Sequence, residues 1–119
     1  MTASSLYERL GGHDTVVAVV DDLYQRLVAD PVVRHHFDPA RLPSLKASQV
    51  RTFSAALGGP PDPDPVDLLA AHADVDITAQ QADATFAHLA AVLAAAGADV
   101  ETTRQVVAVI GRLWWAKGW

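Results

Sequence analysis

The sequence contains no cysteine. Disulfide bonds, thiolate zinc sites, iron–sulfur clusters and cysteine nucleophiles are therefore excluded. Basic residues are also few. The chain has 9 lysines and arginines but 14 aspartates and glutamates, which gives a formal net charge of −5. A nucleic-acid-binding surface needs clustered lysine and arginine, so this balance argues against such a partner.

Long hydrophobic runs are missing as well. The most apolar stretch, LAAVLAAAGA, is too short and too rich in alanine to span a bilayer. The first residues, MTASSLYERLGG, lack the basic start and apolar run of a signal peptide. We therefore expect no membrane association and a cytoplasmic location. The 119 residues are expected to form one domain over 1–119, which is long enough to bury a core.

Apolar residues recur at intervals of three and four, and no stretch alternates in the manner of a strand, so the sequence predicts an all-α fold. Turn and capping residues divide the chain into six helical segments. They are a short piece over 5–10, a helix from an Asp14 cap to about Ala29, a helix from a Ser44 cap to Leu57, about two turns over 66–73, a helix from the Thr78/Gln81 capping box to Gly97, and a last helix capped by Asp99.

Three polar side chains fall on otherwise apolar helical stripes. Gln49 lies between Leu45 and Phe53; it is either a helix-edge residue with its amide in water or a buried group that needs partners. Tyr24 is either a packed core ring or a group that meets a ligand. His72 shares a face with Leu68, and is either a hydrogen-bonded core residue or a metal ligand.

An ordinary metal or catalytic site is not available. His35 and His36 are adjacent and are expected to point in different directions, His13 lies in a loop, and His88 lies at a helix edge. There is no H-E-x-x-H motif, nucleophile elbow or glycine-rich phosphate loop. A single histidine can hold a metal only if another group supplies the remaining ligands, and a porphyrin supplies four nitrogens.

The chain resembles the truncated haemoglobins, most closely their first group, from about Leu6 to Leu113. Each matching stretch is short, but all occur in the family's order and at matching separations. They are SLYERLGGHDTV, DDLYQRLVADP, the phenylalanine of HHFD, SLKASQV, FSAALGGP, the AAH of LLAAHADVDIT, and AHLAAVLAAAG. The resemblance implies the truncated globin fold, a two-over-two helical sandwich around haem b.

The resemblance also implies roles for single residues. His72 matches the proximal iron ligand, and Tyr24 and Gln49 match the polar residues that contact bound gas. Phe37 matches the phenylalanine on the porphyrin face, Leu45 the position where many globins carry a distal histidine, and Phe53 the aromatic residue of a tunnel gate. Gly11-Gly12 and Gly58-Gly59 match two glycine motifs of the family. Leu68 and Ile77 are further expected haem contacts, and Lys46 or Arg41 are candidates by position for the propionates.

The sequence departs from the family pattern in three places. Asp74-Val75-Asp76 follows the proximal histidine where the family is usually rich in glycine, which tolerates positive φ. The segment PPDPDP lacks the aromatic residue common in that loop. The chain ends in RLWWAKGW, and we expect these tryptophans to pack on the core, the haem edge or a second subunit.

The resemblance implies a protein that binds O2, NO and CO. It further implies nitric oxide dioxygenation to nitrate, supported by a separate electron-donating reductase. Two alternatives remain open at the level of sequence: a store or sensor of the same gases without turnover, and a helical interaction module without haem. The chain is expected to be a monomer or a weak homodimer.

Overall fold

The computed structural model describes residues 4–62 and 78–115, and this part of the chain contains helices and no strands. These helices are α1 (Leu6–Leu10), α2 (His13–Ala29), the 3-10 turns η1 (Arg34–His36) and η2 (Pro39–Arg41), α3 (Leu42–Ala56), α5 (Ala79–Ala95) and α6 (Val100–Trp115). The longer of these helices, α2, α3, α5 and α6, each span 15 to 17 residues. The all-α prediction is confirmed.

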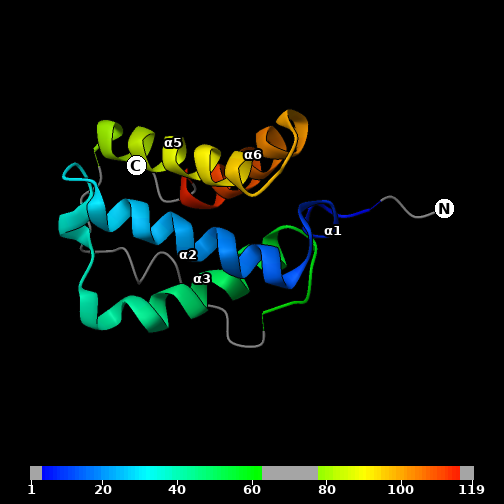
Figure 1. The fold of residues 1–119 in the computed structure, drawn as a ribbon, viewed down its shortest axis with the longest axis horizontal. Helices are drawn as coiled ribbons and strands as arrows, with labels where there is room; N and C mark the ends of the chain where they lie inside the picture. Colours follow the sequence, from blue (N-terminus) through cyan, green and yellow to red (C-terminus); the bar gives the residue numbers. More distant parts are fainter. Residues whose placement is uncertain (1–3, 63–77, 116–119) are drawn as a thin grey trace.

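The four long helices form two layers. Figure 1 shows α5 and α6 as one layer above α2 and α3, and α2 packs against both α3 and α5. The short α1 packs on α6 and α2 at one end. This arrangement is the predicted two-over-two sandwich, with α2 as its most central helix.

The core lies between the layers. Its most deeply buried side chains are aliphatic residues of α2, α5 and α6, together with Phe53 of α3. Those with at most 1 % exposure are Val16, Val19, Val20, Leu23, Leu89, Val92, Leu93, Val106 and Ile110. They recur at three–four spacing along each helix, which is the periodicity that predicted the helices.

Two predicted caps are confirmed and two are wrong. Thr78 and Gln81 form the reciprocal capping box of α5, and Asp99 accepts a hydrogen bond from the Thr102 amide at 2.6 Å. Helix α2 begins one residue before Asp14 and is capped by the backbone of Gly12, without a side-chain cap. Helix α3 begins at Leu42 rather than after Ser44, because Pro43 is well placed in a first turn.

Glycine determines how α1 meets the end of α3. Gly58 adopts a φ of +90°, a conformation that other residues rarely take. A Cβ at Gly59 would lie 2.6 Å from Cδ2 of Tyr7 and 2.9 Å from the Ser54 carbonyl oxygen. The Tyr7 amide donates to the Leu57 carbonyl at 2.9 Å across the same contact. The pair Gly58-Gly59 therefore permits a close approach that a side chain would block.

Within residues 4–62 and 78–115, no helix has the length and apolar character needed to cross a membrane.

Candidate functional site

Tyr24 lies on α2 with its side chain turned into the core. The residue is 7 % exposed, and burial raises the pKa of its hydroxyl well above the ordinary value. The Phe37 ring meets the Tyr24 ring edge to face, with centroids 5.6 Å apart and an interplanar angle of 89°. The hydroxyl is therefore protonated, and it belongs to a ring whose orientation is defined by an aromatic neighbour.

Gln49 lies on α3, the helix that packs against α2. It is 6 % exposed, so the prediction of a helix-edge glutamine with its amide in water is wrong, and the alternative of a buried amide is correct. Its Oε1 atom is fully buried and has no hydrogen-bond partner within the part of the chain that the structure describes. An unsatisfied buried acceptor costs about 1–3 kcal/mol, which makes a missing polar partner the simplest explanation.

The neighbours of Gln49 on α3 supply an apolar surface. Phe53 lies one turn further along and is 2 % exposed, while Leu45 lies one turn earlier and is partly buried against the core. Phe37 is also partly buried and packs on the same core. A hydroxyl on α2 and an amide on α3, both buried among apolar side chains, are polar groups of the kind that orient a ligand in a mostly apolar site.

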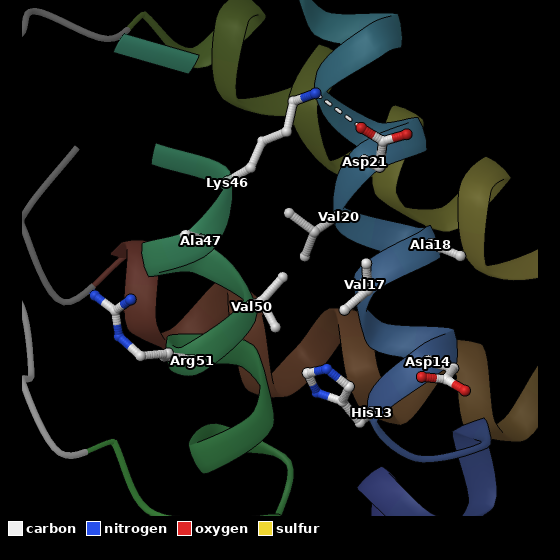
Figure 2. A pocket seen from close by; sticks show the side chains of 10 residues that line it. All are labelled: His13, Asp14, Val17, Ala18, Val20, Asp21, Lys46, Ala47, Val50 and Arg51. Atoms are coloured by element: carbon white, nitrogen blue, oxygen red, sulfur yellow. Dashed lines mark hydrogen bonds and ion pairs between the residues drawn. The ribbon is translucent and has the colours of Figure 1, made fainter. Parts of the chain in front are cut away.

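Lys46 faces a groove between α2 and α3 of about 550 Å³. Its Nζ atom forms an ion pair with Oδ1 of Asp21 at 2.7 Å, which Figure 2 marks with a dashed line. The groove is lined by His13, Asp14, Val17, Ala18, Val20, Asp21, Lys46, Ala47, Val50 and Arg51. Tyr24, Gln49 and Phe53 are not among the lining residues, so the groove is separate from these three buried side chains.

Several predicted residues fall outside the part of the chain that the structure describes. They are His72, Leu68, Ile77 and Asp74-Val75-Asp76. The side chains of the C-terminal tryptophans lie outside it as well. Among residues 4–62 and 78–115, no group of three histidine, cysteine or acidic side chains is arranged to hold a metal ion.

The prediction that His13 lies in a loop is wrong, because His13 is the first residue of α2. His88 on α5 contacts Asp30 at the end of α2, with Nε2 and Oδ2 2.7 Å apart. The prediction that His35 and His36 point in different directions is wrong, because their ring centroids are 4.1 Å apart. Both rings instead reach the side chain of Gln81. The capping-box pattern singled out Gln81 only as a local cap, since sequence spacing carries no information on contacts this distant.

Comparison with known proteins gives consistent results. The family model described as bacterial-like globin matches residues 5–116. The chain is 34% identical over 110 residues to the group 1 truncated hemoglobin GlbN of Mycolicibacterium paratuberculosis, covering 92% of this chain and 81% of the relative. It is 30% identical over 112 residues to the GlbN protein of a Synechocystis species, covering 91% and 90% of the two chains.

Solved structures agree in fold. The truncated hemoglobin of Tetrahymena pyriformis in its Fe(III) form superposes with a TM-score of 0.86 at 27% identity, covering 92% of this chain and 93% of that one. A 2/2 hemoglobin from a Synechococcus species, in the cyanomet state with covalently attached heme, gives a TM-score of 0.82 at 27% identity, with 91% of each chain covered. The two-layer arrangement of α2, α3, α5 and α6 is therefore shared with proteins of this type.

Proposed function

Because this chain belongs to the bacterial-like globin family, which implies haem-based gas binding, we propose that it binds haem b through His72 and holds a diatomic gas beside Tyr24 and Gln49. The observation that supports this placement is the buried side chain of Gln49, whose Oε1 atom has no partner among the residues that the structure describes and could accept from a hydroxyl such as that of Tyr24. Tyr24, on the helix packed against it, contributes a buried protonated hydroxyl.

The cofactor would be held mainly by apolar contact and one imidazole. His72 would bind iron as neutral imidazole, with its other ring nitrogen donating to a backbone carbonyl that fixes the tautomer. Phe37 would pack on the porphyrin face. The side chains proposed to complete the pocket are Leu45, Phe53, Leu68 and Ile77.

The propionates would need cationic partners. Arg41 is available, because its side chain is 86% exposed and its contact with Asp38 is long, at 3.9 Å. Lys46 would first have to leave Asp21.

Haem, when bound, supplies an iron that takes up O2, NO or CO and can transfer one electron. The protein's part is to hold a hydrogen-bond donor at the gas. The Tyr24 hydroxyl donates to the ligand, and the Gln49 amide orients that hydroxyl or donates directly. Leu45 can do neither. A hydrogen bond in a dry pocket is stronger than in water, so the pair favours slow O2 release.

Slow release suits chemistry better than delivery, and the reaction we propose is nitric oxide dioxygenation. One NO, one O2 and one electron, which haem would supply, give one nitrate. A separate reductase would return that electron. Phe53, with the small residues Ala55 and Ala56 beside it, would line the route by which gas reaches the pocket.

The test is rapid mixing of the O2-loaded protein with NO. Dioxygenation predicts one nitrate per haem, formed as fast as the spectrum changes to that of ferric protein. A store or sensor would instead exchange one gas for the other without nitrate. A helical interaction module without haem would give no haem spectrum to follow.

A further inference from the structure

The side chain of Gln81, in the first turn of α5, joins parts of the chain that are far apart in sequence. Its Oε1 atom accepts from the Thr78 amide at 3.0 Å and lies 3.1 Å from Nε2 of His36. Its Nε2 atom donates to the Val32 carbonyl at 3.3 Å and lies 3.4 Å from Nε2 of His35. One amide therefore contacts its own helix cap and three residues of the corner between α2 and α3.

The orientation of this amide is determined by backbone groups. The Thr78 N–H can only donate and the Val32 carbonyl can only accept, so the oxygen and nitrogen of Gln81 cannot be exchanged. It follows that His36 donates from Nε2, and that His35 accepts at Nε2 and carries its proton on Nδ1. The contacts of Gln81 are thus complementary in donors and acceptors rather than merely close.

A second contact holds the same corner. Asp30 accepts from the Val32 amide at 2.9 Å and contacts Nε2 of His88 at 2.7 Å. His88 lies seven residues after Gln81, which is two turns along the same face of α5. The Val32 carbonyl therefore contacts α5 directly through Gln81, and the Val32 amide is linked to α5 through Asp30 and His88.

The corner held in this way carries Phe37. The Phe37 residue directly follows His36, and its ring makes the edge-to-face contact with Tyr24. A displacement of the corner would move the Phe37 ring and release the Tyr24 ring from its present orientation. The contacts thus run without a gap from α5, through the corner, to the side chain proposed to donate to bound gas.

We propose that Gln81 is a positioning residue for the gas site: by tying the first turn of α5 to the corner at 32–37, it holds Phe37 against Tyr24 and fixes the direction of the Tyr24 hydroxyl. The proposal rests on the proposed function of Tyr24. It assigns to the capping-box glutamine a second role, exerted at a distance from the helix end that it caps.

The test compares variants that separate the two roles. Gln81→Leu removes both the cap and the bridge, whereas Thr78→Ala removes the Thr78 hydroxyl from the cap and leaves the bridge. Gln81→Glu keeps an acceptor for Thr78 and His36 and loses the donor to Val32. Gln80→Ala, at an exposed neighbouring position, is the control.

Two readouts are needed, one of which does not depend on haem. Hydrogen exchange at the amides of Arg34, His36 and Phe37 should be roughly tenfold faster in Gln81→Leu than in Thr78→Ala, because the corner loses its anchor. In the haem-loaded protein, O2 release should be about threefold faster or more in Gln81→Leu, with a broadened CO stretching band. Gln81→Glu should show an intermediate effect in both measurements, and Gln80→Ala should show none.

Three outcomes would contradict the proposal, and each has a different cause. If Gln81→Leu and Thr78→Ala change both readouts equally, Gln81 is only a helix cap and the proposal is wrong. If exchange at the corner increases while O2 release and the CO band do not change, the bridge exists but does not position Tyr24, which also overturns the proposal. If the native chain takes up no haem at all, the proposed function fails, and the proposal about the gas site fails with it.

Discussion

The Tyr24 hydroxyl is the residue-scale feature that most directly determines gas affinity. Tyr24→Phe removes the donor and leaves the ring, so we expect O2 dissociation to accelerate by roughly 10- to 100-fold, the equivalent of a hydrogen bond of about 1.5–3 kcal/mol. Burial raises the pKa of the hydroxyl, so the slow release of the native protein should persist to higher pH than for an ordinary tyrosine. Stopped-flow displacement of O2 by CO measures both effects.

Tyr7→Phe is the matched control, because Tyr7 lies on α1 against Gly59. It should leave the rate of O2 release unchanged. An unchanged rate of O2 release in Tyr24→Phe would show that the Tyr24 hydroxyl does not bind the gas.

Replacing Gln49 should stabilise the haem-free chain but weaken O2 binding in the haem-loaded chain. In the haem-free chain, Gln49→Leu removes a buried acceptor without a partner, and we expect the free energy of unfolding to rise by about 1 kcal/mol. In the haem-loaded chain, the same substitution removes a polar group from the gas site, and O2 release should accelerate. Urea unfolding and stopped-flow spectroscopy measure the two quantities. A loss of stability in the haem-free chain would mean that Gln49 already has a partner there.

Residue chemistry alone singled out Tyr24, Gln49 and His72, because each is a polar group on an apolar stripe. It could not decide whether Gln49 is buried. The spacing of apolar residues shows which face of α3 is apolar, but not how far burial extends around the helix. It missed the reach of Gln81 and the pairing of His88 with Asp30. Both contacts join α5 to the turn after α2, and they depend on how two helices are placed relative to one another.

At the scale of the element, the contact between α5 and the end of α2 predicts a response to acid. Hydrogen bonds from His88 and from the Val32 amide lower the pKa of Asp30 below its ordinary value of 3.8. A carboxyl group with a lowered pKa stabilises the fold above its unfolded value, and this contribution is lost as the pH falls through the folded value. The free energy of unfolding should therefore fall more steeply below about pH 4 in the native chain than in Asp30→Asn.

Denaturant unfolding at a series of pH values measures this slope. Asp83→Asn, at an exposed position on α5, is the control and should keep the native slope. Equal slopes in the native chain and in Asp30→Asn would show that this carboxylate does not hold the corner to α5.

The junction of α1 with α3 predicts that two glycines respond differently to alanine. Gly59→Ala places a methyl group 2.9 Å from the Ser54 carbonyl oxygen, and we expect a loss of about 1–3 kcal/mol in stability. Gly111→Ala lies inside α6 with its nearest atom, of Phe86, at 3.4 Å, so it should be neutral or stabilising by up to about 1 kcal/mol. Thermal unfolding compares the two, and equal melting temperatures would contradict the close approach at Gly59.

The helix boundaries illustrate what local sequence can and cannot determine. Thr78 with Gln81 is a reciprocal pair, and the structure forms it as predicted. Asp14 and Ser44 are equally good capping residues in isolation. They lie in the first turns instead, because Gly12 and Pro43 also suit helix starts and packing against the rest of the chain selects between them.

At the scale of the whole molecule, the amphipathic helices of the described residues pack as a two-layer sandwich. Periodicity predicted the helices, but only the resemblance to truncated haemoglobins predicted their arrangement around haem. The same apolar stripes would satisfy several ways of packing four helices, and a pattern of burial does not choose among them. Family membership and the superposition on solved relatives settle the fold.

Absorption spectroscopy of the purified chain mixed with hemin tests whether His72 holds haem. We expect the native chain to bind one hemin and to develop the intense blue absorption band of a protein-bound iron porphyrin. His72→Gly should lose that band and regain it when imidazole is added, whereas His88→Gly should keep it throughout. A native chain that develops no such band, or a His72→Gly variant that binds hemin with an unchanged spectrum, would contradict the account.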